Sequence, residues 1–247
     1  GIQSFNRNLD LFRVANGALV EGPISAHNNG TTAVDFSPDR QLMASGGRDG
    51  TAKLWHLPEM TLIRTLQESP GYQPRVFAVA FSSDGRLLAV GGQGGVQLFR
   101  VLDGKLIRKM SGAASTLSLA FSPDGQILAA GSNAIDQNGE CTDCSIKMWR
   151  VSDGVLLRTI NGRNVGIISI AFSPNQRQIA AGSADRVYSG VVRFWRVSDG
   201  ALLRRFNQDP NNPLSYVTGV AYSPDGRLFA YARADRLVVV ARNPFSP

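Results

Sequence analysis

Residues 167–195 have the sequence IISIAFSPNQRQIAAGSADRVYSGVVRFW. This pattern predicts a strand, a Ser-Pro turn, a second strand, a loop and a third strand that ends in tryptophan. It returns as TAVDFSPDRQLMASGGRDGTAKLW (32–55), FAVAFSSDGRLLAVGGQGGVQLF (77–99), LSLAFSPDGQILAAGS with SIKMW (117–149) and TGVAYSPDGRLFAYARADRLVVVA (218–241). The aromatic residues before the turns are 45, 40, 51 and 50 residues apart: Phe36, Phe81, Phe121, Phe172 and Tyr222. A period in this range indicates supersecondary units that stack on one another.

Each repeat contains four short segments with the character of β-strands. In the first, large apolar residues stand two apart, as Val34 and Phe36 do, which is the period of a strand. A Ser-Pro-Asp-Gly turn follows, in which Pro presets φ and Gly supplies a positive φ. The second segment ends in glycine in most copies, the third ends in an aromatic residue, and the fourth follows an Asn-Gly or Asp-Gly turn. Four antiparallel strands in about 40–45 residues are typical of a propeller blade, so we predict an all-β fold.

These features resemble the WD-repeat β-propeller family over nearly the whole chain. The resemblance rests on the Phe-Ser-Pro-Asp-Gly turns, the Ala-Ala-Gly-Ser strands and the tryptophans. The Asp that gives the family its name is absent after the third-strand aromatic residue. The family's hydrogen-bonded structural tetrad fits one repeat only, as His27, Ser45, Asp49 and Trp55. The stretches WRVSDGVLLRTI (149–160) and WRVSDGALLRRF (195–206) indicate tandem duplication, in a style that resembles prokaryotic members of the family.

The repeats divide the chain into units of one expected domain, residues 1–247. Residues 29–66, 75–110, 115–160 and 166–206 form four complete units, residues 1–28 form a half-unit, and residues 214–242 supply three strands. The most economical ring has five blades, with the strand at 18–24 completing the last unit and 8–14 left as a surplus strand. This closure would leave no exposed sheet edge. A six-bladed ring and an incomplete larger ring are the alternatives.

The composition is that of an ordinary globular protein, with 247 residues of which 43% are hydrophobic and 18% charged. No apolar run approaches the roughly 18 residues that a membrane helix needs, so we expect no membrane span. No signal peptide is visible, and we expect a cytoplasmic location, although a chain that starts at Gly1 can be cut from a longer protein. The net charge of +7 permits acidic partners, including nucleic acid.

The connections of variable length give the strongest prediction about function. Long loops follow fourth strands at 67–74 and 207–214, and insertions follow second strands at 133–144 and 185–190. In a four-stranded meander both kinds of connection lie at the same end, where loops on a rigid scaffold commonly bind partners. The resemblance implies a non-enzymatic scaffold within a larger signalling or sensor protein, so we expect a protein or peptide partner; neutral drift in loop length is the alternative. Exposed Tyr and Arg anchor interfaces, and the expected contacts are Arg48, Tyr72, Gln73, Arg186, Tyr188 and Tyr216.

The longest insertion contains Cys141-Thr-Asp-Cys144, for which three states are open. The cysteines can be free thiols, a local disulfide, or part of a metal or redox site. A zinc site needs four ligands, and the two histidines, His27 and His56, lie far away in the sequence. The acidic residues of the same insertion do not have the spacing of a calcium loop. We therefore expect neither a metal nor a cofactor.

The sequence gives little support to catalysis. His27, Ser45 and Asp49 superficially resemble a hydrolase triad, but the structural tetrad is the preferred interpretation. There is no Gly-x-Ser-x-Gly elbow and no phosphate-binding Gly-x-x-x-x-Gly-Lys loop. A propeller hydrolase would need a carboxylate cluster at the central channel, and the inner strands offer only Asp35. We expect no catalytic residues, and a hydrolase remains an unfavoured alternative.

Arginine recurs at one position of the fourth strand, which is the outermost strand of a blade. The copies form a possible basic rim: Arg64, Arg108, Arg158 and Arg204. Such a rim could bind nucleic acid or another polyanion, which is the second functional hypothesis. The favoured interpretation is protection of exposed strand edges by charge. The sequence predicts no oligomeric state.

Overall fold

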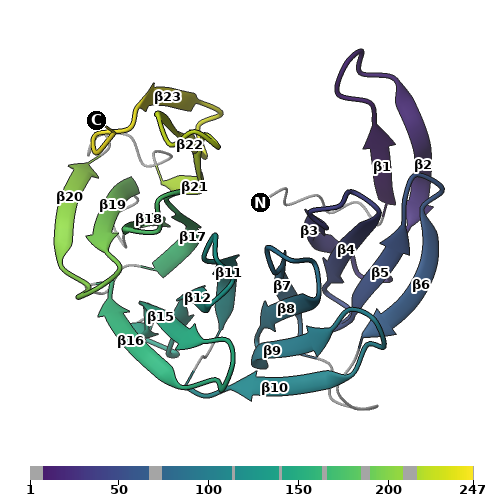
Figure 1. The fold of residues 1–247 in the computed structure, drawn as a ribbon, viewed down its shortest axis with the longest axis horizontal. Coiled ribbons are helices and arrows are strands. Elements are labelled where there is room, and N and C mark those ends of the chain that lie inside the picture. The colour runs from purple at the N-terminus through teal and green to yellow at the C-terminus, as the bar shows by residue number, and fades with distance from the viewer. Residues whose placement is uncertain are drawn as a thin grey trace. The chain divides into compact units, whose positions relative to one another are not determined.

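The structure is a computed structural model that describes residues 8–66, 74–112, 115–138, 141–162, 166–184, 190–207 and 216–246 (Figure 1). Within these ranges every regular element is a β-strand, which confirms the predicted all-β class. No helix in them is long and apolar enough to cross a membrane. The chain divides into two compact units, residues 1–110 and 111–247, each of which is described by itself. The single domain expected from the repeats remains a prediction.

The first unit contains one two-stranded hairpin and two four-stranded sheets, drawn from purple to teal in Figure 1. The hairpin consists of β1 (Asn8–Phe12) and β2 (Leu19–Ser25). The first sheet consists of β3 (Thr31–Phe36), β4 (Leu42–Gly47), β5 (Ala52–His56) and β6 (Thr61–Leu66). The second sheet consists of β7 (Val76–Phe81), β8 (Leu87–Gly92), β9 (Gly95–Arg100) and β10 (Leu106–Met110). Each sheet is an antiparallel meander in chain order, as predicted.

The second unit contains two four-stranded sheets, one three-stranded sheet and a short inserted hairpin. The first sheet consists of β11 (Thr116–Phe121), β12 (Ile127–Ser132), β15 (Ser145–Arg150) and β16 (Leu156–Asn161). The next consists of β17 (Gly166–Phe172), β18 (Gln178–Ala184), β19 (Gly190–Arg196) and β20 (Leu202–Asn207). The last consists of β21 (Val217–Tyr222), β22 (Leu228–Arg233) and β23 (Val238–Arg242). The inserted hairpin consists of β13 (Ala134–Ile135) and β14 (Cys141–Asp143).

The recurring turn between first and second strands is held together by its serine. The Ser37 hydroxyl donates to Asp39 Oδ1 at 2.5 Å and accepts the amide of Leu42 at 2.9 Å. The same pair of hydrogen bonds forms in the other copies, at Ser82, Ser122, Ser173 and Ser223. The turn position with positive φ is a glycine in three copies. In the other two copies it is Arg40, with a φ of 63°, and Gln176, with a φ of 62°. The motif therefore closes the turn through local side-chain chemistry, and glycine eases the backbone where it is present.

Glycines in the second strands allow neighbouring sheets of the same unit to approach closely. A Cβ on Gly131 would lie 2.5 Å from Cγ2 of Ile167, which belongs to the first strand of the next sheet. A Cβ on Gly182 would lie 2.4 Å from Cγ1 of Val217 in the same manner. Because real Cβ contacts do not reach such distances, a larger side chain would force the sheets apart.

Three details differ from the sequence-based expectations. The second strands extend further than the segments expected at 42–45 and 87–90, because β4 ends at Gly47 and β8 at Gly92 and both include the glycines that follow. The hairpin β13–β14 within the long insertion was not predicted. The segments expected as strands at 8–14 and 18–24 are β1 and β2, and they pair with each other. Completion of the last sheet by residues 18–24, and the number of blades in the ring, remain predictions.

Candidate functional site

The insertion between β12 and β15 folds into a short, partly exposed hairpin that is the best-defined candidate for an interaction site. Ala134 pairs with Asp143 and Ile135 pairs with Cys141 across β13 and β14. The Thr142 hydroxyl adds a hydrogen bond to the Ala134 carbonyl at 3.1 Å. Ile135 is 60% exposed, so the hairpin presents an apolar side chain to solvent.

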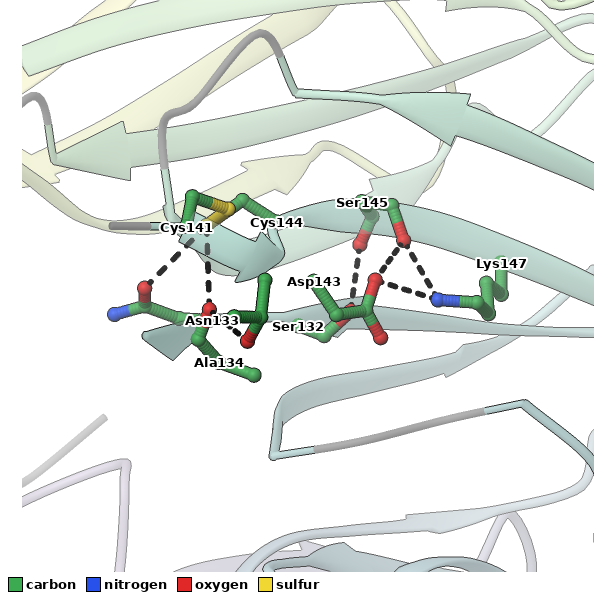
Figure 2. Close-up of a disulfide and its surroundings, with 9 residues drawn as sticks. Ser132, Asn133, Ala134, Cys141, Asp143, Cys144, Ser145 and Lys147 are labelled. Atoms are coloured by element: carbon green, nitrogen blue, oxygen red, sulfur yellow. Dashed lines mark hydrogen bonds and ion pairs between the residues drawn. A yellow bond between two sulfur atoms is a disulfide. The ribbon is translucent and has the colours of Figure 1, made fainter. Parts of the chain in front are cut away.

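A disulfide between Cys141 and Cys144 anchors the second strand of this hairpin, as Figure 2 shows. Cys144 is buried, and its sulfur lies 3.7 Å from Oδ1 of Asn133 and 3.9 Å from the carbonyl oxygen of Ala134. Of the three states left open by the sequence, the structure shows the disulfide. No group of three or more His, Cys, Asp or Glu side chains is placed to hold a metal ion in the described part of the chain.

A polar cluster fixes the base of the hairpin onto β15. Asp143 Oδ1 accepts hydrogen bonds from Lys147 Nζ at 2.5 Å and from the Ser145 hydroxyl at 2.6 Å (Figure 2). The side chains of Lys147 and Asp143 are only 12% and 15% exposed, so solvent screens this ion pair less than a surface pair. The Ser132 hydroxyl donates to the Ser145 carbonyl at 3.1 Å. The hairpin thus has a rigid base and an exposed outer part.

Sequence reasoning found the insertion but not its hairpin. The two strands are very short, and β13 has only two residues, so no alternation of polar and apolar residues could mark them. The sequence Asn138-Gly139 between them is a hairpin signal that could have located the turn.

The predicted partner contacts are only partly described by the structure. Arg48 is half-buried in the turn between β4 and β5, where its amide donates to the Gly30 carbonyl at 3.0 Å. Tyr216 is half-buried just before β21, and its carbonyl accepts the amide of Ala234 at 3.0 Å. The other four lie outside the described residues: Tyr72, Gln73, Arg186 and Tyr188. As contacts for a partner, all six remain predictions.

The four residues proposed as a structural tetrad form a continuous hydrogen-bonded chain in the first unit. Trp55 Nε1 can only donate, and it donates to Ser45 Oγ at 2.9 Å. With a neutral imidazole, the Ser45 hydroxyl donates to His27 Nε2 at 2.8 Å, and His27 Nδ1 donates to Asp49 Oδ1 at 3.0 Å. This polarity needs a neutral imidazole with its proton on Nδ1. The network ties β4, β5 and the segment before β3 together.

Burial governs the charge states in this network. Burial lowers the pKa of His27 below its ordinary value, although the neighbouring Asp49 carboxylate acts in the opposite direction. Burial by itself would raise the pKa of Asp49. The hydrogen bonds that its carboxylate accepts, first among them the one from the Thr51 hydroxyl, outweigh burial and leave the pKa of Asp49 below its ordinary value. Ser45 has no exposed surface and its oxygen already accepts the indole N–H, which is a poor arrangement for a nucleophile.

Asp35, the inner-strand carboxylate considered for a hydrolase, links two sheets of the first unit. Its Oδ2 accepts the amide of Phe81 in β7 at 2.8 Å, and its Oδ1 accepts the amide of Phe36 at 2.9 Å. Burial raises the pKa of Asp35, and these two hydrogen bonds partly oppose the rise. Both oxygens are thus engaged in holding backbone.

The fourth-strand arginines make contacts between sheets of the same unit. Arg158 Nη1 and Nη2 donate to the carbonyls of Asp199 and Ser198, at 2.7 and 2.6 Å, in the turn between β19 and β20. Arg64 packs against the turn between β9 and β10, which is the equivalent turn in the first unit. This contact is close, since a Cβ added to Gly104 would lie 2.3 Å from Arg64 Cδ. Arg108, like these two, is half-buried. Arg204 is exposed, with its guanidinium carbon 4.7 Å from the centre of the Phe206 ring.

Comparison with known proteins assigns the family. The model of the WD domain, G-beta repeat, matches residues 20–56, 60–100, 104–150 and 154–196, which is more than half of the chain. The chain belongs to the WD-repeat family. Each four-stranded sheet is accordingly one blade of the propeller type.

Several WD-repeat relatives cover most of this chain at low identity. It is 25% identical to Protein HIR1 of Kluyveromyces lactis, over 81% of this chain and 26% of that protein. It is 29% identical to the ribosome biogenesis protein WDR12 homolog of Chlamydomonas reinhardtii, over 71% of this chain and 46% of that protein. It is 26% identical to the guanine nucleotide-binding protein subunit beta of Zea mays, over 86% of this chain and 57% of that protein. The chain therefore spans about a quarter to just over half of these relatives.

Proposed function

We propose that the chain is a non-enzymatic module that binds a protein or peptide partner through the loops at one end of its blades. The hairpin β13–β14 is the central contact in the second unit, together with the neighbouring connections. The predicted contacts Arg48, Tyr72, Gln73, Arg186, Tyr188 and Tyr216 belong to the same kind of connection. The proposal includes the expectation that the chain is part of a larger signalling or sensor protein.

The observation that carries the proposal is the construction of the hairpin. A disulfide and a poorly exposed Asp143–Lys147 ion pair hold its base, while Ile135 stays 60% exposed. Rigid presentation of an apolar group lowers the ordering cost of binding. Family membership supports the same conclusion, because one relative is named as a subunit and another as a ribosome biogenesis protein.

The alternatives receive less support from the contacts. A polyanion site on the fourth-strand arginines would use Arg158, but both of its terminal nitrogens donate to backbone carbonyls. A hydrolase site on His27, Ser45 and Asp49 would need an accessible hydroxyl, and Ser45 is fully buried.

The test is a pull-down from the source lysate that uses the intact chain as bait. The wild type is compared with two variants, both changed in the first sheet of the second unit. In the hairpin variant, residues 134–142 become Gly-Ser-Gly and Cys144 becomes Ser, while Asp143 stays to pair with Lys147. The control is Val155→Ser, which removes a 49% exposed apolar side chain at the opposite end of β15. We expect a protein partner that the wild type and the control retain and the hairpin variant loses.

Equal recovery of every partner by all three baits would refute the hairpin as the docking site. A recovery that nuclease treatment abolishes would instead support the second hypothesis, nucleic-acid binding by the arginine rim. Each bait is first checked by circular dichroism, so that loss of the fold is not mistaken for loss of a contact.

A further inference from the structure

The disulfide between Cys141 and Cys144 is placed where it can open without unfolding the blade. It closes a loop of only four residues, in the connection from β14 to β15. Disulfides that close short loops contribute least to the free energy of unfolding. The four strands of the blade, β11, β12, β15 and β16, pair with one another in a continuous sheet that does not include this connection. The fold of the blade therefore depends little on the bond.

The disulfide instead holds the outer part of the hairpin. Asp143, at the base, is fixed separately, because its carboxylate accepts a hydrogen bond from Lys147 Nζ at 2.5 Å. Further out, β13 and β14 are joined by two pairs of residues, and the outer pair is Ile135 with Cys141. The bond to Cys144 ties this outer pair to the start of β15. Reduction would thus loosen the exposed end of the hairpin and leave its base in place.

The two sulfur atoms differ in their surroundings. Cys141 is half-buried, so a thiolate in solution can reach its sulfur, whereas Cys144 is 5% exposed. Cys144 Sγ lies 3.7 Å from Asn133 Oδ1 and 3.9 Å from the carbonyl oxygen of Ala134 (Figure 2). A disulfide sulfur has no proton to donate to these acceptors, but the sulfur of a Cys144 thiol has one. The hairpin therefore contains hydrogen-bond acceptors for Cys144 that only the reduced form can use.

We infer that the Cys141–Cys144 disulfide is a redox switch that a dithiol reductant opens, and that opening it weakens partner binding by the hairpin. A thiolate of the reductant attacks Cys141 Sγ, the S–S bond breaks, and its electron pair leaves on Cys144 Sγ, which takes up a proton. The second thiol of the reductant then displaces Cys141 as a thiol. The protein gains two electrons and two protons, and the reductant becomes a disulfide. The effect on binding rests on the proposed function, whereas the switch itself does not.

The surroundings favour a switch over a catalytic disulfide. Catalytic Cys-x-x-Cys pairs activate the attacking cysteine at a helix N-terminus or beside a cation. Every regular element in the part of the chain that the structure describes is a strand. The cation of the cluster, Lys147, is only 12% exposed and is paired with Asp143. Disulfides that solvent can reach are commonly the labile, regulatory ones, which agrees with the exposure of Cys141.

The experiment places the intact chain in mixtures of reduced and oxidised dithiothreitol. Alkylation with N-ethylmaleimide and mass spectrometry give the fraction of reduced chain, and amide hydrogen exchange reports on the hairpin. We expect reduction without denaturant, and exchange about tenfold faster or more in residues 134–138 and 141–143. Exchange in β11, β12, β15 and β16 should change less than about twofold. Oxidised dithiothreitol should restore the original rates.

Three variants make the comparison specific. Cys141→Ser with Cys144→Ser should exchange like the reduced wild type and should not respond to dithiothreitol. Asn133→Ala removes an acceptor that only the thiol can use, so half-reduction should need a ratio of reduced to oxidised dithiothreitol about two- to fivefold higher. The matched control is Ser132→Ala, which removes a neighbouring hydrogen bond that involves neither sulfur and should leave this ratio unchanged.

Reduction only after urea has unfolded the blade, or reduction that leaves exchange in the hairpin unchanged, would overturn the switch. The effect on binding is measured by pull-down with the oxidised wild type and the double serine variant, and the variant should recover about fivefold less partner or lower. Equal recovery by these two baits, with none by the bait that lacks the hairpin, would overturn the regulation and leave the proposed function standing. Equal recovery by all three would refute the docking site, and the exchange rates would still decide whether the disulfide is a switch.

Discussion

Replacing Ser45 by Ala tests whether the network around His27 supports the fold. The hydroxyl is fully buried and makes two hydrogen bonds, with the Trp55 indole at 2.9 Å and with His27 Nε2 at 2.8 Å. Its removal leaves one buried donor and one buried acceptor without partners, each at a cost of about 1–3 kcal/mol. We therefore expect the free energy of unfolding to fall by about 2–6 kcal/mol. Urea unfolding followed by circular dichroism measures this change.

A second substitution separates the hydrogen bonds from general damage to the core. Trp55→Phe removes the indole N–H, and the next blade has Phe99 at the position equivalent to Trp55 and Val90 at the position equivalent to Ser45. Trp55→Phe should lower the free energy of unfolding of the Ser45→Ala variant by about 1–2 kcal/mol less than it lowers that of the wild type. In the variant the indole N–H no longer has a hydrogen bond to Ser45 to lose. Ser132→Ala is the matched control, since this buried hydroxyl donates one hydrogen bond, at 3.1 Å.

The reasoning fails if Ser45→Ala changes the free energy of unfolding by less than about 0.5 kcal/mol, or if the two substitutions are additive. A hydrolase would give another result, in which Ser45→Ala abolishes turnover of an ester substrate and leaves stability unchanged.

Four further predictions follow from other contacts. Arg40→Gly should stabilise the first unit by about 0.5–1 kcal/mol, because it relieves a φ of 63°, and an unchanged urea midpoint would contradict this. Since burial lowers the pKa of His27 below 6.5, the unfolded chain binds the proton more readily. The stabilisation should therefore be complete above about pH 6.5 and decline as the pH falls below it, and His27→Gln should flatten this decline in urea titrations. Arg158→Leu should lower the free energy of unfolding by about 1–2 kcal/mol through loss of two charge-assisted hydrogen bonds, with Arg158→Lys recovering less than half. Cys141→Ser with Cys144→Ser should speed amide hydrogen exchange in residues 134–138 and 141–143 while β11 and β12 keep their protection; uniform loss of protection would show that the disulfide supports the whole blade.

The strands and their turns were predictable because both depend on local chemistry. Alternation of apolar residues, as in Val34 and Phe36, fixes the face of a strand, and the serine of the turn bonds to groups only two and five residues away. The tetrad residues could be chosen because the family resemblance supplies their spacing. The structure shows hydrogen bonds among these four residues at the sheet β3–β6, which is the repeat to which the sequence pattern assigned the tetrad.

The remaining features depend on contacts between distant segments. Nothing near Gly131 in the sequence shows that it faces Ile167, and nothing near Arg158 shows that it reaches the turn at 198–199. The short strands of the β13–β14 hairpin carry too few residues for any periodic pattern. The state of the two cysteines was open because a Cys-x-x-Cys spacing is compatible with several chemistries.

The central claim, that a partner docks on the hairpin β13–β14, is tested most directly by photocrosslinking. A benzophenone amino acid at position 135 replaces a side chain that is 60% exposed, and the same probe at position 155 replaces one that is 49% exposed at the opposite end of β15. Irradiation in the source lysate should give a discrete crosslinked protein with the probe at 135 and none with the probe at 155. The same product from both positions, or a product from 155 alone, would contradict the account.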